Sequence, residues 1–373
     1  MNAFFVNPDV AILGTGLLVA ASSALLGTFL VLRRSSLLTD AISHAVLLGI
    51  VLVYLLTGNA YSPLFVLGAA LAGLGVVLLS ELLASSRRVK TDAAIGLVYP
   101  LLFAVAVVLI NVFARNVHID QDAVLLGEIG FVWIDTTTVL GLELPKAMLT
   151  LLAVTLANLL FVLLFYKELK LTLFDAGLAA ALGFSPVLVF YLLLGLTSVT
   201  AVAAFDAVGA VLFVAFVIVP SAAAYLLTDE LWRMLAYGVL IGMASSLLGY
   251  PTAVLLDVSI GGMMALYTGL FLLLALLLGP RYGLWAQAAR RRGERERNAV
   301  RTLLVHLYHH ERDAAASENA VEALQSHLRW SPQEARSALE RGLGQGLLLR
   351  EGALLRLTSA GRAQAREVLE PGA

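Results

Sequence analysis

The stretch that decides the fold is residues 32–54, LRRSSLLTDAISHAVLLGIVLVY, which is apolar enough to cross a membrane yet contains an Asp and a His. Asp40 and His44 are four residues apart, so a helix places them one turn apart on the same face. Ionisable side chains at membrane depth are costly, and they mark substrate paths, proton relays or internal pairs. The pattern therefore predicts a cation site at Asp40 and His44. The alternative is that Asp40 pairs with His44 and caps the start of the helix.

The composition indicates an integral membrane protein in contact with membrane lipid. Of 373 residues, 60% are hydrophobic and 14% are charged, and the mean hydropathy is +0.89. These values lie far from those of a soluble domain. The chain has no Cys, so a bound metal would need oxygen and nitrogen ligands. The first apolar run is too long for a signal peptide and is expected to remain as a membrane span.

The charges divide the chain into two domains. Residues 1–280 hold 10 Lys and Arg against 15 Asp and Glu, whereas residues 281–373 hold 15 Arg against 11 acidic residues. This shift predicts a transmembrane domain over 1–280, a basic linker over 281–297 and a small cytoplasmic domain over 298–373.

The apolar runs predict an all-α polytopic domain with nine transmembrane helices. Most runs have about 20 residues, which suffices to cross about 30 Å of hydrocarbon. The expected spans are 9–32, 37–57, 62–83, 94–113, 147–166, 186–204, 207–228, 234–250 and 261–280. Asp206 interrupts the run from 186 to 228, so an arrangement with eight spans and a re-entrant segment stays open.

The basic residues orient this arrangement in the membrane. Lys and Arg concentrate in cytoplasmic loops. Those that fall on one side are Arg33, Arg34, Arg87, Arg88, Lys90, Lys167, Lys170, Arg233 and the cluster within 281–297, and only Arg115 and Lys146 fall opposite. The amino terminus is therefore expected outside and the carboxyl terminus in the cytoplasm.

The tail from residue 298 has the order of a winged-helix domain. Helical patterns cover 299–310, 317–328 and 331–343, and Ser331, Pro332 and Glu334 form a capping-box pattern. Two short strands turning at Glu351 and Gly352 and a last helix follow. This segment is similar to the DNA-binding part of the metal-dependent repressors of the DtxR type, particularly in its ending, LTSAGRAQAREVL.

Four stretches of the first domain together resemble the permease subunits of the ABC importers for manganese, zinc and iron. They are LRRSSLLTDAISHAVLLGI (32–50), KTDAAIGLVYPLLFA (90–104), YKELKLTLFDAGLAAALG (166–183) and AVGAVLFVAFVIVPSAAAYLLT (207–228). The resemblance implies a homodimer of permeases, separate ATPase subunits and an extracytoplasmic metal-binding protein. No G-x-x-x-x-G-K-[ST] motif occurs, so this subunit is expected to be non-catalytic and to depend on a partner that hydrolyses ATP.

If the two-fold axis of such a dimer follows the transport path, Asp40 and His44 of both chains supply two carboxylates and two imidazoles. These ligands suit Mn²⁺, Zn²⁺ and Fe²⁺, of which we favour Mn²⁺. The metal would be cargo, with no tightly bound cofactor. Asp206 is a weaker candidate, because it either lines the path or ends a helix at the surface.

The segment 166–186 is expected to couple the permease to its ATPase. It joins two spans through a short helix, with Asp175 as a candidate N-cap and Gly183 near the end of the helix. Short connectors of this kind are common, so the assignment depends on the resemblance.

Two other functions compete with the importer. One is a membrane-anchored, metal-responsive regulator whose winged helix binds DNA, and the other is a secondary transporter or channel. DNA is not expected as a partner, because the excess of basic charge in the tail is small and Glu334 and Glu340 lie on the presumed recognition helix.

Overall fold

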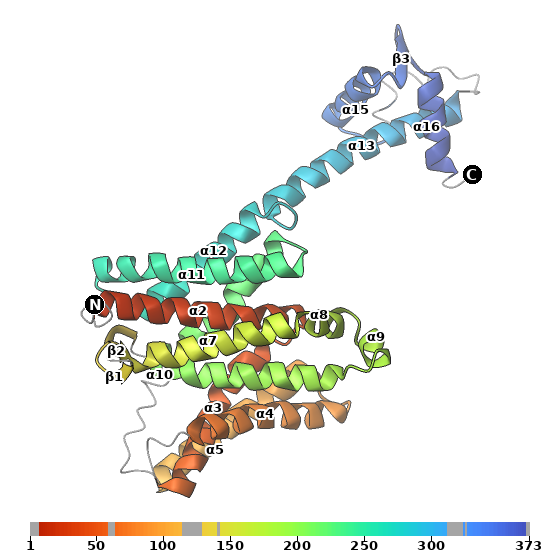
Figure 1. Cartoon of the computed structure of the whole chain (residues 1–373). Coiled ribbons are helices and arrows are strands. Elements are labelled where there is room, and N and C mark those ends of the chain that lie inside the picture. Colours follow the sequence, from red (N-terminus) through yellow and green to blue (C-terminus); the bar gives the residue numbers. More distant parts are fainter. Residues whose placement is uncertain are drawn as a thin grey trace. The chain divides into compact units, whose positions relative to one another are not determined.

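The computed structural model describes residues 7–58, 64–113, 129–139, 142–311, 324 and 327–370. The chain forms two compact units, Met1–Gly283 and Leu284–Ala373. Figure 1 shows that the first unit is a bundle of long helices, and that the second contains the long helix α13 (Leu284–His310), shorter helices and a small hairpin.

Nine helical stretches in the described part of the chain are long and apolar enough to cross a membrane, which agrees with the predicted number. Seven of them are separate helices: α2 (Pro8–Leu32), α3 (Leu37–Thr57), α4 (Leu64–Ser85), α5 (Thr91–Phe113), α7 (Lys146–Leu164), α11 (Leu231–Leu256) and α12 (Ile260–Leu278). The other two, Pro186–Phe205 and Ala207–Leu227, both belong to α10 (Pro186–Leu227).

The two halves of α10 meet at a kink rather than at a loop. Gly209 has φ 74° and ψ 169°, a backbone conformation essentially restricted to glycine. The sequence predicted the break near Asp206, three residues earlier. Asp206 belongs to the helix, but its side chain lies outside the described residues, so its predicted role at the path stays a prediction.

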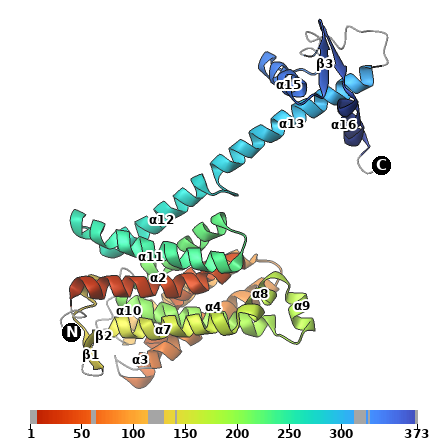
Figure 2. The ribbon, with the colours of Figure 1, turned by 45° about the horizontal axis from the view of Figure 1, so that its top comes forward.

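The core of the first unit lies around α2 and α10. Figures 1 and 2 show α2 between α11 and α7, and α10 contacts α2, α3, α4, α7, α11 and α12. Small residues let these helices approach closely, as is usual in membranes. A Cβ atom built on Gly27 would lie 1.9 Å from the carbonyl oxygen of Val217, and one on Gly49 would lie 2.2 Å from that of Gly68.

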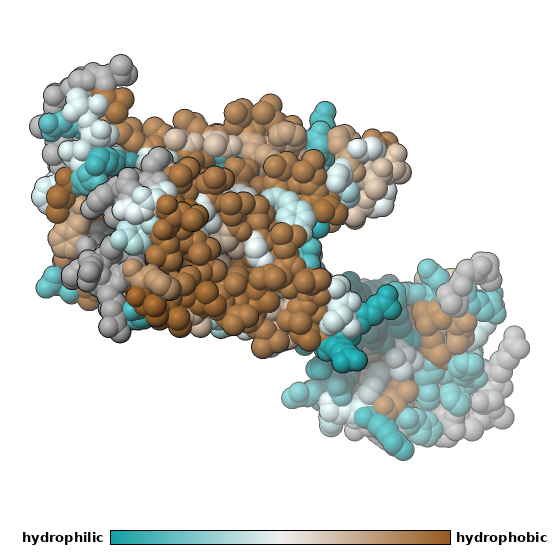
Figure 3. All heavy atoms as spheres, turned by 90° about the horizontal axis from the view of Figure 1, so that it is seen from below, coloured by the Kyte–Doolittle hydropathy of each residue, from teal (hydrophilic) through white to brown (hydrophobic). Residues whose placement is uncertain are grey.

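The surface of the first unit is largely apolar. Figure 3 shows hydrophobic residues over most of its visible face, and large exposed side chains include Leu71, Leu82, Leu101 and Leu163. Soluble monomers rarely expose apolar patches of this extent. Such a surface is suited to membrane lipid.

A β-hairpin precedes α7 and corrects the expectation that the first unit is entirely α-helical. Strand β1 (Thr136–Val139) pairs with β2 (Leu142–Pro145) in antiparallel register, after the short 3₁₀ helix η1 (Ile129–Phe131). The β-branched run of Thr136–Val139 favours a strand. An ion pair of 2.6 Å between Lys146 and Asp135 closes the base of the hairpin.

The second unit has the order helix, helix, hairpin, helix. Its elements are α13 (Leu284–His310), α15 (Pro332–Gly344), β3 (Leu348–Glu351), β4 (Leu354–Leu357) and α16 (Ser359–Leu369). Its core contains Leu303, Leu304, Leu324, Leu348 and Leu355, all nearly or fully buried. The stretch 281–297, expected as a linker, is helical from residue 284 onward. Most of the helix expected over 317–328 lies outside the described residues.

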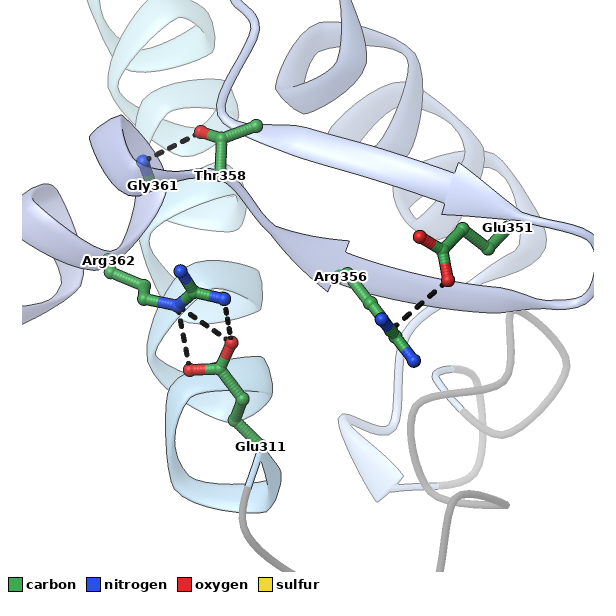
Figure 4. Close-up of polar contacts among 6 residues, drawn as sticks. All are labelled: Glu311, Glu351, Arg356, Thr358, Gly361 and Arg362. Carbon is green, nitrogen blue, oxygen red and sulfur yellow. Dashed lines mark hydrogen bonds and ion pairs between the residues drawn. The ribbon is translucent and has the colours of Figure 1, made fainter.

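Local signals in the second unit form as predicted. The Ser331 hydroxyl accepts a hydrogen bond from the Glu334 amide, and the Glu334 carboxylate accepts one from the Ser331 amide at 3.0 Å, which completes the capping box. The hairpin turns at Gly352, where φ is +66°. Figure 4 shows two ion pairs of this unit, Glu351 with Arg356 and Glu311 with Arg362.

Candidate functional site

The turn between α2 and α3 places the Asp40–His44 pair. Arg34 adopts the left-handed conformation with φ 57°, and the Ser35 amide donates to the Leu30 carbonyl oxygen at 2.9 Å. These are features of a Schellman motif, which satisfies the last carbonyl groups of α2. The next helix, α3, therefore begins at Leu37 and carries Asp40 in its first turn, where the helix dipole favours a carboxylate.

Asp40 and His44 lie next to each other, as the sequence predicted. The distance from His44 Nε2 to Asp40 Oδ1 is 3.6 Å. The side chain of His44 is 30% exposed and that of Asp40 is 41% exposed. The opposite face of α3 is filled by Ala41, Ile42 and Ala45, which are fully buried. The helix therefore uses its apolar face for the core of its own chain and leaves the ionisable pair accessible.

Two aromatic rings of α5 hold the imidazole of His44. Tyr99 stacks on it with ring centroids 5.3 Å apart and planes at 17°, and Phe103 meets it edge-on at 5.7 Å and 79°. Neither Tyr99 nor Phe103 was predicted from the sequence. Their spacing of four residues on one helix is the only local signal that could have singled them out.

Within one chain, Asp40 and His44 are too few to complete a metal site by themselves. Among the described residues, no three or more His, Asp or Glu side chains are grouped so that they could hold a metal. Asp40 offers a carboxylate and His44 offers an imidazole nitrogen. Transition metals in proteins generally take four or more ligands. The pair can therefore serve as a metal site only together with ligands from elsewhere.

The predicted coupling residues flank a short helix in a different segment. Helices α8 (Tyr166–Phe174) and α9 (Ala176–Ala181) follow α7, and Asp175 Oδ1 accepts a hydrogen bond from the Leu178 amide at 2.8 Å. This confirms Asp175 as an N-cap. Gly183 ends the helix with φ +87°, and the Phe184 amide donates to the Ala179 carbonyl oxygen, so the sharp stop requires glycine.

Apolar side chains project from this capped segment. Leu178 is 48% exposed, Leu182 61% and Phe184 41%. A short rigid helix with exposed leucines is a surface that another protein can bind.

Known proteins share this arrangement of helices. The ABC 3 transport family matches residues 9–279, a stretch that runs from α2 to α12. The zinc transport system membrane protein TroD of Treponema pallidum is 43% identical over 351 residues, which cover 93% of this chain and 96% of that protein. An alignment of this extent reaches into the second unit. The manganese transport system membrane protein MntD of Bacillus subtilis is 48% identical over 273 residues, or 73% of this chain and 92% of that protein.

A solved structure has the same fold. PsaBC from Streptococcus pneumoniae in complex with Fab superimposes with a TM-score of 0.63 and 30% identity, covering 76% of this chain and 98% of that chain. The family match over residues 9–279 and the two relatives lead to the same conclusion. The chain belongs to the ABC 3 transport family.

Proposed function

We propose that this chain is the permease subunit of an ATP-driven importer that carries divalent transition metals from an extracytoplasmic binding protein to the cytoplasm. The family match over residues 9–279 carries this proposal. Its relatives are named as zinc and manganese transport proteins. We favour Mn²⁺ as cargo, followed by Zn²⁺ and Fe²⁺, and all three accept carboxylate and imidazole ligands.

The transit site is formed by Asp40 and His44 of two copies of the chain. The support is that each chain presents one accessible carboxylate and one accessible imidazole and lacks a third ligand among the described residues. Two chains related by a two-fold axis would supply two carboxylates and two imidazoles. Two negative charges then offset one divalent cation, which lowers the cost of holding it within the membrane.

Metal uptake by two variants tests this function. Asp40→Asn and His44→Gln keep the size and polarity of each side chain but remove the charge or the imidazole ligand. The full transporter should lose most of its uptake of radioactive manganese and zinc, while the permease still assembles with its ATPase.

The matched control is Glu143→Gln, which removes a carboxylate at an exposed position of strand β2, outside the helices α3 and α5 that form the proposed site. This control should transport normally. Normal uptake by both Asp40→Asn and His44→Gln would contradict the proposed transit site.

The ATPase binds the segment that contains α9, between Asp175 and Gly183. The exposed Leu178 and Leu182 provide its apolar contact. The chain itself has no phosphate-binding G-x-x-x-x-G-K-[ST] motif, so the subunit is non-catalytic and its energy comes from the partner. This arrangement requires α9 on the cytoplasmic side, with the amino terminus outside and the carboxyl terminus inside, as the distribution of Lys and Arg favours.

The second unit is a cytoplasmic winged-helix module that regulates transport. Its support is the order α13, α15, β3, β4, α16 around a single apolar core. DNA binding requires many contacts from Lys and Arg to phosphates. Several Arg residues of this unit are instead paired with carboxylates, as Arg341 is with Glu296 and Arg362 with Glu311.

Removal of the second unit tests its role. A chain ending at Gly283 removes the complete unit, whereas a cut at Arg297 would divide α13. The truncated protein should still transport metal, with a changed rate or a changed response to internal metal. Two results together would favour a DNA-binding regulator instead. The truncated protein would transport metal as the full chain does, and the full chain would retain duplex DNA at physiological salt.

A further inference from the structure

Three histidines of the second unit lie close together. His306 and His310 are on α13, and His327 lies on the segment that precedes α15. The ring centroids of His306 and His310 are 4.7 Å apart, and those of His306 and His327 are 5.9 Å apart. His306 thus contacts both other imidazoles.

The packing of the unit brings these residues together. His306 and His310 are four residues apart, so they share one face of α13. Leu303 and Leu307 on the same helix are buried in the core together with Leu324. The Leu328 amide donates to the Leu324 carbonyl oxygen at 3.0 Å, which orders the backbone beside His327. The position of His327 near α13 therefore follows from the apolar core.

The end of α13 is also fixed by α16. Arg362 donates from Nε to both carboxylate oxygens of Glu311, at 2.7 and 3.0 Å, as Figure 4 shows. Arg366 donates to the Tyr308 hydroxyl at 3.0 Å. These contacts flank His310 along the chain, so the backbone of the histidine pair is held in place before any ligand binds.

Imidazoles at this spacing are suited to a transition metal. Two His residues one turn apart on a helix are a recurrent ligand pair for zinc, and three His ligands with one open position form a common zinc site. Imidazole favours Zn²⁺, Co²⁺, Ni²⁺ and Cu²⁺, whereas Mn²⁺ favours oxygen ligands. As the rings stand, the described residues do not yet form a metal-ligand group, so metal binding requires the imidazoles to rotate. His306 and His310 are partly exposed and His327 is exposed, so a metal ion from solvent can reach the three rings.

We propose that His306, His310 and His327 form a second metal site, selective for Zn²⁺ and Co²⁺ over Mn²⁺. A metal held by the three imidazoles would cross-link α13 to the segment that leads into α15. The site differs in ligand chemistry from Asp40 and His44, since it contains no carboxylate.

Metal binding by the purified full chain tests the proposal. The chain carries Asp40→Asn and His44→Gln to remove the proposed transit site, and it is prepared without a polyhistidine tag. Titration with Co²⁺ should produce the visible absorption of a four- or five-coordinate cobalt site, saturate at one metal per chain and be reversed by Zn²⁺. Mn²⁺ at the same concentration should not compete.

Single substitutions identify the ligands. His306→Asn, His310→Asn and His327→Asn should each weaken cobalt binding by at least about tenfold, since loss of even an outer-shell partner of a metal site costs that much. His309→Asn is the matched control, because His309 lies on the same helix, is exposed, and has its ring beside Tyr308. It should bind cobalt like the parent chain.

Two results would overturn the proposal. One is the absence of saturable cobalt binding by the parent chain, and the other is binding that none of the three variants weakens more than His309→Asn does. Circular dichroism distinguishes loss of a ligand from loss of fold, and His306→Gln provides a second substitution if His306→Asn unfolds. Because this test omits the transit site, the histidine site can be disproved while the proposed importer function stands. Equally, the importer function can be disproved while the histidine site binds metal.

Discussion

Replacing Tyr99 with leucine is expected to weaken metal capture at His44. The phenol ring stacks on the imidazole with centroids 5.3 Å apart, and leucine fills similar space without a flat face. An aromatic pair of this kind contributes about 0.5–1.5 kcal/mol beyond its buried area. If that energy holds the imidazole in its metal-binding orientation, its loss raises the half-saturating metal concentration by about 2- to 12-fold.

The assay is the initial rate of manganese uptake across a range of metal concentrations, with Tyr99→Phe as the control. Phenylalanine keeps the stacked ring and loses only the hydroxyl, so its half-saturating concentration should match that of the parent protein. The maximal rate of Tyr99→Leu should change little, because the ligands themselves are retained. The proposed role of the stacked ring is wrong if Tyr99→Leu leaves the half-saturating metal concentration unchanged. It is also wrong if Tyr99→Phe loses as much affinity as Tyr99→Leu.

Three further changes have defined outcomes. Gly183→Ala should lower the amount of metal transported per ATP hydrolysed. The positive φ at this position costs an alanine about 1–2 kcal/mol, so the α9 segment would shift. Gly58→Ala is the control, because Gly58 also has a positive φ of +66° and open space around it, and this variant should stay coupled. Gly49→Val should lower the unfolding temperature in detergent, because its Cβ would meet the backbone of α4 at 2.2 Å, and an unchanged temperature would show that the helices are not this close. Ser331→Ala should speed amide hydrogen exchange in the first turn of α15, corresponding to about 1 kcal/mol for a lost N-cap. The hydrogen bonds from the Ser331 amide and hydroxyl hold the pKa of Glu334 below its usual range, so the protection in the parent chain should be full at neutral pH and decline as the pH falls through that lowered value.

The membrane helices were predictable because hydropathy depends on local sequence. The span 37–57 coincides with α3, and the other predicted ends fall within three residues of the observed ones, except that α11 continues to Leu256, six residues beyond the predicted end of 234–250. The break within α10 was predicted near Asp206 because a charge interrupts the apolar run there. The structure places it at Gly209, because the backbone conformation at the kink requires glycine rather than a polar side chain.

The Asp40–His44 pair was predictable from a spacing of four residues on a helix, but its surroundings were not. Tyr99 and Phe103 reach His44 through the packing of α5 on α3, which brings together residues far apart in sequence. The same limit applies to His327, which is near His306 only because the second unit folds around a shared core.

The second unit shows which local signals carry information about structure. The capping box at Ser331 and the turn at Gly352 formed as predicted, because each depends on neighbouring residues alone. The stretch 281–297 was expected to be a basic linker, and most of it lies in α13. Arg, Glu and Ala are good helix formers, so its composition is compatible with a charged, exposed helix.

We propose that two copies of the chain bind one transported metal through Asp40 and His44. Metal binding is measured on the purified permease in which His306, His310 and His327 are replaced by Asn, so that only the membrane site contributes. We expect one Mn²⁺ or Zn²⁺ per two chains, an X-ray absorption spectrum with imidazole nitrogen and carboxylate oxygen in the first shell, and loss of the bound metal in Asp40→Asn and in His44→Gln. Bound metal that persists in both variants with an unchanged spectrum would contradict this proposal.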